Sequence, residues 1–367
     1  MNKYTTDEKL YLEAKQKYYQ GNPIMTDREF DELEAKLKSA GSAVIHIVGF
    51  GDRNLKFPHL TPMLSLSKYQ TNKTSGKPPI EDATNWMKKH IIEKQEHFEW
   101  TPKFDGNAAS LQYKNGKLHM ILSRGDGTKG RDITDKLYHQ VPKTIPETAD
   151  VEIRGEVVMP RDIFQKKYAK EFANERNLVA GILNKDVTPE TKSRLKDIVL
   201  MAVEIKKIDH GTVKYINIDN LESWGFNKQY PLEKYWVHYS DFEDRFYKME
   251  EYREKRCPFL LDGFVIKVAE KYRNQFGENS HDPNWAVAIK FSPKDAVTEL
   301  IDIEWSFGKT GEYIPIAILK PISLDGTVVK RASLYNAGYV LKNKILPGKK
   351  VKIVKAGDII PQIIEVL

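Results

Sequence analysis

A short segment of the chain holds residues that could carry covalent chemistry. Lys103 lies between a proline and a strand-like run in "WTPKFDGNAAS", and Asp105 and Gly106 follow it closely. A lysine that has lost its proton is a nucleophile, and neighbouring cations and partial burial promote that loss. Most lysines are nevertheless solvated surface charges. Lys103 taken alone is therefore better interpreted as a surface charge.

Two further lysines occupy positions where a charge is costly. Lys267 lies in "LLDGFVIKV" and Lys290 in "WAVAIKF", and an unpaired ammonium is expensive to bury in such apolar runs. Strand alternation places small neighbours, such as Gly263 and Ala288, on the same faces. Either lysine alone could equally lie on an exposed face. Together they favour a common anion, most simply a phosphate, which both would contact.

A glycine loop precedes a short helical segment. "SRGDGTKGRD" matches G-x-G-x-x-G at Gly125, Gly127 and Gly130, but only about two helical turns fit before Val141-Pro142. A dinucleotide-binding parallel fold needs a long helix there, so the match argues against that fold. The loop carries Arg124, which could line a nucleotide site and converge with Lys267 and Lys290 on Lys103.

The segment "VEIRGEVVM" alternates strictly. Val151 and Ile153 share one face, while Glu152, Arg154 and Glu156 share the other. For this segment alone, the simplest interpretation is a strand whose polar face lies in water. Glu156, beside a glycine, could instead contact a ribose hydroxyl.

The surrounding elements predict an α+β protein. Thr5-x-x-Glu8 and Thr26-x-x-Glu29 are capping-box patterns, so the first forty residues predict a helical hairpin. Residues 58–296 predict a largely antiparallel sheet structure with helices over 160–176 and 241–256, and Asn115-Gly116 predicts a type I′ hairpin. About five strands in residues 297–367 predict a small barrel of the OB type.

Composition limits the functional classes. A length of 367 residues predicts two or three domains, and the chain has no apolar run long enough to span a membrane. One cysteine, Cys257, excludes an internal disulfide framework and a multi-cysteine zinc site, and fits a reducing, cytosolic compartment. A net charge of +7 favours an anionic partner, nucleic acid first, although this signal alone is weak.

Taken together and in this order, "KFDG", "SRGDG", "EIRGEV", "DGFVIKV" and "WAVAIKF" resemble the nucleotidyltransferase motifs of covalent polynucleotide ligases. More narrowly, "HLTPMLSL", "FANERN", "GKTGEYIPIAIL", "RASLYNAGYV" and "KAGDIIPQIIEV" resemble the NAD-dependent DNA ligases of bacteria and some of their phages. The N-terminal "YYQGNPIMTDREFDEL" is similar to that family's module for binding nicotinamide mononucleotide. The resemblance covers residues 8–367. It implies a helical nicotinamide-mononucleotide-binding module over 1–57, a mainly antiparallel, ATP-grasp-like nucleotidyltransferase (adenylation) domain over 58–296, and an OB-fold domain over 297–367.

The resemblance also implies a reaction. Lys103 would attack the adenylyl phosphate of NAD+, and the resulting lysyl-AMP would pass AMP to the 5′-phosphate of a nick in duplex DNA, which the 3′-hydroxyl then displaces. Mg2+ would assist, with Asp105 and Glu156 as candidate ligands. The residues implied at the nucleotide site are Tyr18, Tyr19, Asp27, Phe30, Asp31, Ser65, Leu66, Thr101, Arg124, Glu156, Lys267 and Lys290. Those implied at the DNA are Arg176, Lys309, Thr310, Lys355, Ile359 and Ile360.

Four departures from the family's pattern stand out. The family usually has glutamate where Thr101 stands, histidine where Tyr19 stands, and tyrosine where Phe30 stands, which affects recognition of NAD+. The family also continues into a four-cysteine zinc finger, a helix-hairpin-helix domain and often a BRCT domain. We expect a split ligase with these modules on a second chain, a minimal enzyme, or a truncated piece, with no zinc in this chain.

Two alternatives to an NAD-dependent ligase stay open. One is an ATP-dependent ligase or capping-type nucleotidyltransferase, which shares the lysine motif but has no use for the N-terminal "TDREFDEL" segment. The other is a non-catalytic nick-binding module, which would be expected to have lost Lys103, Lys267 or Lys290. The expected location is the cytoplasm of a bacterium or of a phage-infected host cell.

Overall fold

The structure is a computed structural model that divides into two compact units, Met1–Phe291 and Ser292–Leu367. The helical module predicted over 1–57 is part of the first unit, so the three-domain division stays a prediction. No helix among the residues the structure describes is long and apolar enough to cross a membrane. These residues are 5–19, 24–25, 27–42, 44, 56–71, 78–93, 96–172, 174–185, 188–226, 234–279, 281–291, 295–307, 313–324, 327–356 and 360–367.

The N-terminal helices form the predicted hairpin from α1 (Thr6–Tyr19) and α2 (Asp27–Ser39). The capping box at α1 is confirmed, because the Thr5 amide donates to Glu8 Oε2 at 2.7 Å and the Glu8 amide donates to Thr5 Oγ1 at 3.3 Å. Tyr11 stacks on Phe30 with ring centroids 4.7 Å apart, which joins the two helices. The predicted cap at Thr26 lies outside the described residues.

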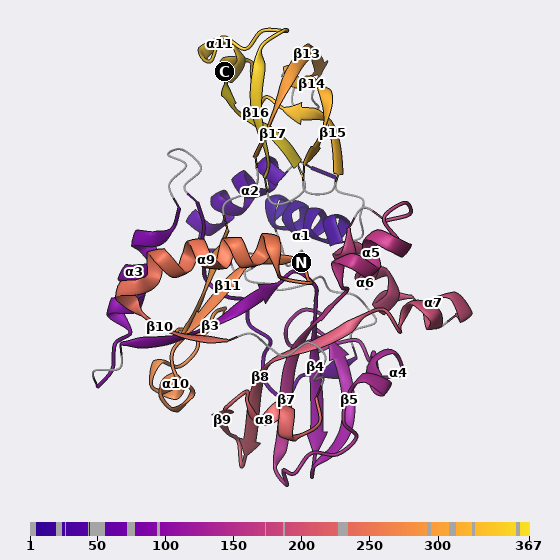
Figure 1. Ribbon diagram of the computed structural model, residues 1–367, viewed down its shortest axis with the longest axis vertical. Coiled ribbons are helices and arrows are strands. Elements are labelled where there is room, and N and C mark those ends of the chain that lie inside the picture. The colour runs from indigo at the N-terminus through magenta and orange to yellow at the C-terminus, as the bar shows by residue number, and fades with distance from the viewer. Residues whose placement is uncertain are drawn as a thin grey trace. The chain divides into compact units, whose positions relative to one another are not determined.

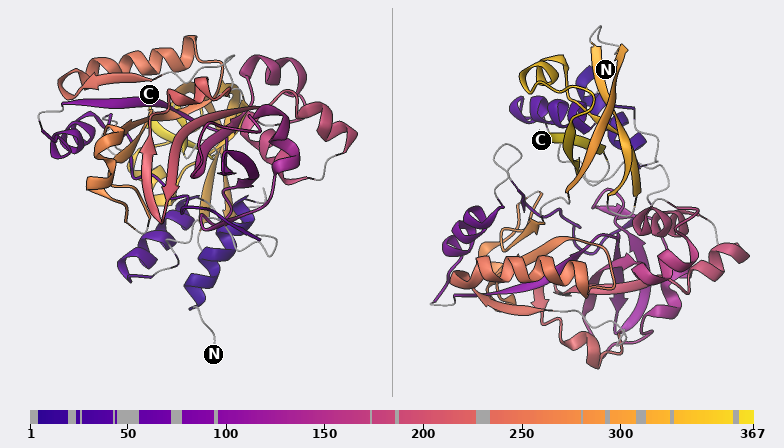
Figure 2. Two further views of the ribbon diagram at one scale, coloured as in Figure 1. Left: turned by 90° about the horizontal axis from the view of Figure 1, so that it is seen from below. Right: turned by 45° about the horizontal axis from the view of Figure 1, so that its top comes forward.

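The first sheet has the order β10-β3-β11-β12-β2 and pairs antiparallel except at β12–β2. One face is apolar, because Trp100 and Phe264 stack there at 4.5 Å. Phe242 of helix α9 packs on both rings, and Phe246 of the same helix packs on Phe264. Figures 1 and 2 show α9 lying across these strands. The strands are β2 (Lys68–Tyr69), β3 (His97–Phe104), β10 (Tyr235–His238), β11 (Leu261–Lys267) and β12 (Ala286–Lys290), and α9 is Phe242–Lys255.

The second sheet has the order β5-β4-β7-β8-β9 and is antiparallel throughout. The predicted hairpin is confirmed, since Asn115 and Gly116 join β4 to β5 with φ values of 48° and 71°. A short pair, β1 with β6, lies beside the glycine loop. The strands are β1 (Phe57–Pro58), β4 (Asn107–Lys114), β5 (Lys117–Ser123), β6 (Lys129–Gly130), β7 (Asp150–Val158), β8 (Val199–Asp209) and β9 (Thr212–Ile216).

Helices cover the apolar face of the second sheet, where Leu111, Ile153 and Ile205 are fully or almost fully buried with Leu178 and Ile182 of α6. The helix predicted over 160–176 is wrong in its middle, because α5 ends at Lys167 and a turn separates it from α6. The prediction for 241–256 is confirmed by α9. The other helices are α3 (Ile80–Lys89), α4 (Thr134–Leu137), α5 (Arg161–Lys167), α6 (Glu175–Asn184), α7 (Pro189–Arg194), α8 (Asn220–Ser223) and α10 (Glu270–Phe276), with 3₁₀ turns at Tyr138–Gln140 and Tyr239–Asp241.

The second unit is the predicted small barrel. Its five strands close in the order β13-β14-β15-β17-β16 around Leu300, Ala317 and Ile353, which are fully buried. The barrel elements are β13 (Asp295–Phe307), β14 (Tyr313–Leu324), β15 (Thr327–Ser333), α11 (Ala337–Lys342), β16 (Lys350–Ala356) and β17 (Ile360–Val366).

The glycine loop of the first unit also agrees with the prediction, because helix α4 after it has four residues, too few for a dinucleotide-binding fold.

A pair of glycine substitutions tests the close strand pairing around Gly263. A Cβ at Gly263 would lie 2.0 Å from the carbonyl oxygen of Ile289 on the adjacent strand, so Gly263→Ala must push β11 and β12 apart. We expect a loss of about 2 kcal/mol or more in the free energy of unfolding. The matched control is Gly181→Ala in α6, where a Cβ meets nothing within 4 Å, and we expect a gain of roughly 0.5–1 kcal/mol. Chemical denaturation measures both, and equal effects of the two substitutions would contradict the strand geometry.

Candidate functional site

One face of the first sheet carries several of the predicted nucleotide-site residues side by side. On β3, β11 and β12, Lys103 is opposite Gly263 and Gly263 is opposite Lys290. Directly opposite residues of antiparallel strands point to the same side of the sheet. Gly263 lies between the two lysines, and the adjacent backbone of Ile289 leaves no room for a side chain there.

Asp262 holds the two lysines together. Its carboxylate oxygens lie 2.5 Å from Lys103 Nζ and 2.8 Å from Lys290 Nζ. Burial of the Asp262 carboxyl, whose side chain is 11% exposed, opposes its ionisation, but the two ammonium groups outweigh burial and hold its pKa below the usual value. The sequence pattern did not identify Asp262 as a site residue, although it lies in the same segment, "LLDGFVIKV", as Lys267.

Lys267 does not join this group, which corrects the expectation that Lys267 and Lys290 share one anion near Lys103. Lys267 is opposite Glu99 on β3 and Ala286 on β12, four residues along the sheet from the Lys103 row. Its Nζ lies 3.4 Å from Glu99 Oε1 and donates to the Val203 carbonyl at 3.2 Å. Arg273 contacts the other Glu99 oxygen at 3.1 Å. Lys267 therefore belongs to a buried ion cluster at the opposite end of the face.

The positions between these two ends are uncharged. Thr101 is opposite Val265, and Val265 is opposite Ala288. All three are buried. This middle row separates a cationic group at Lys103 and Lys290 from the ion cluster at Glu99, and its small and apolar side chains suit a flat, weakly polar ligand group such as a base.

The second sheet brings an acidic side chain toward Lys103. Burial raises the pKa of the Glu156 carboxyl to about 7, while Lys103 and Arg176 act on its charge in the opposite direction and Asp105 reinforces the rise. β3 ends at Phe104, so Asp105 lies just beyond the strand that carries Lys103. Its Oδ1 accepts from Arg176 Nη1 at 2.9 Å, so a predicted DNA-contacting residue lies beside the nucleophile segment.

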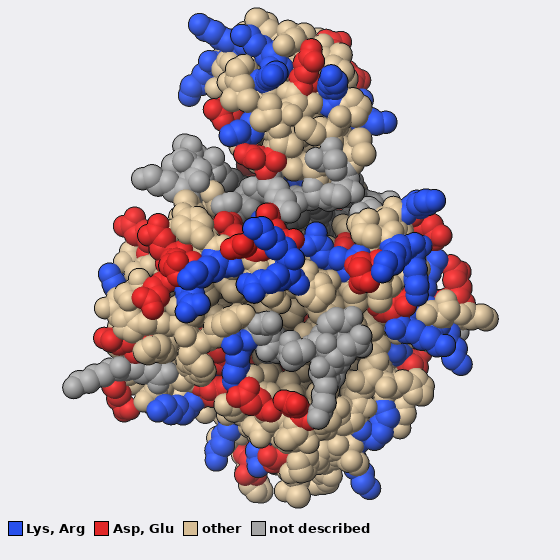
Figure 3. All heavy atoms as spheres, viewed as in Figure 1, with Lys and Arg blue, Asp and Glu red and all other residues tan. Residues whose placement is uncertain are grey.

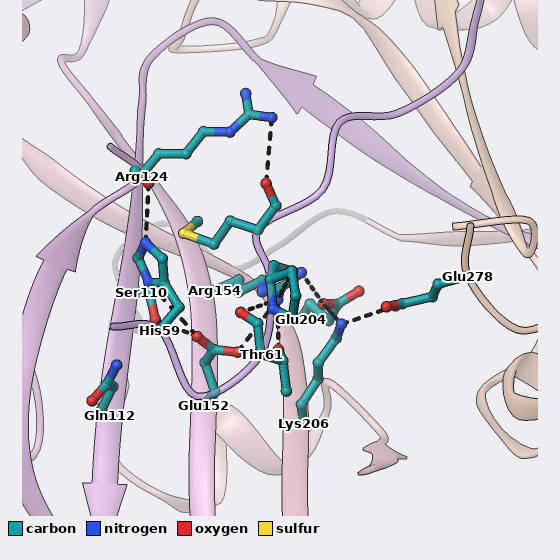
Figure 4. A network of polar contacts seen from close by, with 12 residues as sticks. His59, Thr61, Ser110, Gln112, Arg124, Glu152, Arg154, Glu204, Lys206 and Glu278 are labelled. Atoms are coloured by element: carbon teal, nitrogen blue, oxygen red, sulfur yellow. Dashed lines mark hydrogen bonds and ion pairs between the residues drawn. The ribbon is translucent and has the colours of Figure 1, made fainter. Parts of the chain in front are cut away.

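The polar face of β7 is buried, which corrects the interpretation that it lies in water. The side chains of Glu152 and Arg154 are 0% and 13% exposed. They face residues 57–69, a segment that includes the predicted adenosine contacts Ser65 and Leu66. Arg124 from the glycine loop also reaches this segment and donates to Ser65 Oγ at 3.0 Å. Figure 4 shows Arg124 near the network around Arg154. The polar alternation of the sequence did not reveal that a second layer covers this face.

The remaining predicted residues are not among the contacts described above. Phe30 packs in the helical hairpin, and Lys355 is buried in β16. Lys309, Thr310 and Ile359 lie outside the described residues. The structure describes the backbone but not the side chains of Tyr18, Tyr19, Asp27, Asp31 and Ile360.

Charge alone does not locate a nucleic-acid surface. On the face shown in Figure 3, basic and acidic side chains are interspersed over the unit that contains both sheets. The described residues contain no group of three or more His, Cys, Asp or Glu side chains arranged to hold a metal ion. Asp105 and Glu156 are two carboxyls close enough to influence one another, which fits Mg2+, an ion that usually takes one or two protein carboxylates together with substrate phosphates.

Most of the chain matches known protein families. Residues 53–294 match the NAD-dependent DNA ligase adenylation domain, and residues 297–367 match the NAD-dependent DNA ligase OB-fold domain. The first match begins after the helical hairpin. Residues 1–37 match a PGRL1 N-terminal domain instead.

Curated relatives agree with these matches. A DNA ligase of Staphylococcus saprophyticus is 34% identical over 95% of this chain, and one of Anoxybacillus flavithermus is 34% identical over the same share. The chain spans about half the length of these relatives, 54% and 53%. Among solved structures, a Lig E DNA ligase aligns with a TM-score of 0.46 and 12% identity over 84% of this chain and 100% of that one, a similarity too low to assign function.

The raised pKa of Glu156 predicts that removing its charge stabilises the fold more at high pH than at low pH. A carboxyl whose pKa is about 7 when folded and 4.5 when unfolded stabilises the fold at low pH and loses that stabilisation as pH rises through 7. In EDTA and without nucleotide, we expect Glu156→Gln to gain about 2 kcal/mol more in unfolding free energy at pH 8 than at pH 5. Denaturant titrations at both pH values measure this difference.

The control for this experiment is Glu81→Gln, which removes a carboxyl at an exposed position of α3. A pH-independent effect at Glu156 would show that its carboxyl ionises normally.

Proposed function

Because the chain belongs to the NAD-dependent DNA ligase family, we propose that it is the adenylating portion of a ligase that seals nicks in duplex DNA with NAD+. The observation that carries this proposal is the placement of Lys103 beside Lys290 and Asp262, with Glu156 of the second sheet within electrostatic reach. A nucleophilic lysine, cations for a phosphate and carboxyls for a divalent metal meet at one end of one sheet face.

In the first step, Nζ of Lys103 gives up its ammonium proton, for which the Asp262 carboxylate at 2.5 Å is the neighbouring acceptor, and attacks the adenylyl phosphorus of NAD+. A phosphorus–nitrogen bond forms, the phosphoanhydride bond breaks, and nicotinamide mononucleotide leaves with the bridging oxygen. Lys290 lies 2.8 Å from the carboxylate that also holds Lys103, so it can contact a phosphate that displaces Asp262. Charge on the phosphate oxygens increases during the transfer, and fixed cations at this position stabilise it.

The second and third steps use the DNA. AMP passes from Lys103 to the 5′-phosphate of the nick, and the 3′-hydroxyl then attacks that phosphate and releases AMP. Bound Mg2+ would neutralise phosphate charge in these transfers, and Asp105 and Glu156 are the residues that would hold it. Arg176, 2.9 Å from Asp105 and half exposed, is in a position to contact DNA phosphate next to Lys103.

The nucleotide itself fits along the sheet face. With the phosphate at the Lys103 end, the adenine would lie over Thr101 and Val265, and Ser65 and Leu66 would contact the adenosine from residues 57–69. Lys267 and Glu99 then lie at the base end of the site, so Lys267 is proposed as a contact to the base end rather than to the phosphate. Recognition of the nicotinamide half is assigned to the helical hairpin, through Tyr18, Tyr19, Asp27, Phe30 and Asp31.

The adenylation step is tested by intact-mass measurement after incubation with Mg2+ and either NAD+ or ATP. We expect one AMP adduct from NAD+, none from ATP, and none from Lys103→Ala with either nucleotide, because the adduct forms on that lysine. Lys248→Ala, which removes a lysine that is exposed on α9, is the matched control and should form the adduct normally. An adduct from ATP alone would assign the chain to the ATP-dependent class, and an adduct on Lys103→Ala would exclude Lys103 as the nucleophile.

The DNA step is tested by binding to a nicked duplex at several salt concentrations. If contacts are mostly to phosphates, the logarithm of the association constant should fall linearly and steeply with the logarithm of salt concentration. Arg176→Ala should make this slope shallower by roughly one and leave the AMP adduct intact. We expect weak sealing by these 367 residues alone, because the relatives are about twice as long and nick binding is proposed to be shared with the part that the chain does not span. Robust sealing at ordinary salt would show that this part is not needed.

A further inference from the structure

One segment runs from the second sheet to the first and includes the proposed adenosine contacts. This segment, residues 57–69, is called the strap. It begins as β1 paired with β6 and ends as β2 alongside β12. Between these strands, the Met63 amide donates to the Gly127 carbonyl at 2.7 Å and the Ser65 amide donates to the His281 carbonyl at 2.9 Å. The strap is therefore attached to the glycine loop at its start and to the first sheet at its end, and Ser65 and Leu66 lie in its second half.

Arg154 grips the strap near its middle. Its Nη2 donates to the Thr61 carbonyl at 3.2 Å, to Thr61 Oγ1 at 2.6 Å and to the Pro62 carbonyl at 2.6 Å. Three acceptors on two consecutive residues define both the position and the direction of the strap there. Figure 4 shows the Arg154 guanidinium pointing at Thr61 from β7. A lysine would lose the second terminal nitrogen, Nη1, which lies 3.4 Å from Glu204 Oε1 while Nη2 contacts the strap.

Arg154 is itself fixed by buried carboxylates. Its two terminal nitrogens lie 3.3 Å from Glu152 Oε2 and 3.4 Å from Glu204 Oε1. Glu152 is fully buried and also accepts from Ser110 Oγ at 2.6 Å and from the Thr61 hydroxyl. The Thr61 hydroxyl thus accepts from Arg154 and donates to Glu152, and it joins the strap to both members of this ion pair.

The ion pairs around Arg154 extend toward the first sheet. Glu204 Oε1 lies 3.7 Å from Lys206 Nζ, which lies 3.0 Å from Glu278 in the loop that leads toward β12. Lys206 is 1% exposed, so its charge requires these partners. The carbonyl of Val203, next to Glu204, accepts from Lys267 at the base end of the proposed nucleotide site. The contacts around Arg154 are therefore continuous with the far end of that site.

We propose that Arg154 is a positioning residue that sets the strap, and with it Ser65 and Leu66, in the place where the adenosine of the substrate binds. Arg154 and Glu152 both hydrogen-bond to the Thr61 hydroxyl, and so they position the strap together. This inference rests on the proposed function, since it concerns the adenosine site of that reaction. A buried apolar contact would hold two sheets together equally well. A guanidinium that donates to three acceptors on the strap also fixes the path of the strap, which an apolar contact would not do.

Thr61→Val and Thr61→Ser form the test pair, because valine removes the hydroxyl and keeps the shape whereas serine keeps the hydroxyl. The measurement is AMP binding to the full chain by titration calorimetry. We expect Thr61→Val to weaken AMP binding about tenfold, the effect of losing one hydrogen bond to a charged donor. Thr61→Ser should stay within about twofold of the parent chain, and Arg154→Lys should behave like Thr61→Val.

Thr191→Val is the control for a purely structural effect. Thr191 is 7% exposed, as is Thr61, and its hydroxyl lies 3.0 Å from the Thr188 hydroxyl in α7, within the same unit. We expect both valine variants to lower the melting temperature similarly, while only Thr61→Val changes AMP binding. Unchanged AMP binding in both Thr61→Val and Arg154→Lys, or equal weakening by Thr191→Val, would overturn the proposal. If Thr61→Val fails to unfold cooperatively, Arg154→Lys and Thr61→Ser decide the question.

The outcome is separable from that of the proposed function. A chain that binds AMP, shows the Thr61→Val effect and forms no lysyl-AMP from NAD+ would support the strap assignment and refute the ligase proposal. A chain that forms lysyl-AMP and binds AMP normally after both substitutions would refute the strap assignment alone. No AMP binding by the parent chain would also refute it.

Discussion

Burial of charge is the constraint on which the rest of this structure depends. Each of the two sheets has one apolar face covered by helices and a second face rich in charged side chains. Those second faces are largely withdrawn from water, so nearly every charge there must have a partner. Asp262 pairs with two lysines, Glu99 with a lysine and an arginine, and Arg154 with two glutamates. At the candidate site two lysines share one aspartate, so positive charge is left for a ligand.

The local pattern of the sequence predicted much of the fold. The hairpin at Asn115-Gly116, the capping box at Thr5, the barrel strands and the strands containing Lys103, Lys267 and Lys290 follow from alternation and turn chemistry, because these signals act within a few residues. The break between α5 and α6 was not predicted, since residues 168–174 are amphiphilic enough to continue a helix and tertiary packing decides otherwise.

The arrangement of the site could be predicted only in part. Strand parity correctly gave the faces of Lys267 and Lys290 but not which of their neighbours in the other strands would be opposite, and register decides that Lys290 meets Lys103 while Lys267 meets Glu99. Parity also gave the polar face of β7 but not the strap that covers it, because the contact between Thr61 and Arg154 spans more than ninety positions. Long-range contacts of this kind carry no local signal in a single sequence.

Thr101 can now be interpreted through the charges on either side of it. At one end of the sheet face, Lys103 and Lys290 carry two positive charges against one on Asp262, which leaves one positive charge. At the other end, Lys267 and Arg273 carry two against one on Glu99, which again leaves one. A glutamate at position 101 would add a second carboxylate on this face of β3, two residues from Glu99, and cancel one of these two positive charges. Threonine keeps these two groups net positive, and Glu99 supplies a carboxylate at the proposed base end. In the proposed reaction, threonine in place of the glutamate that the resemblance implies would therefore alter the balance of charge around the base more than the capacity of Lys103 to meet a phosphate.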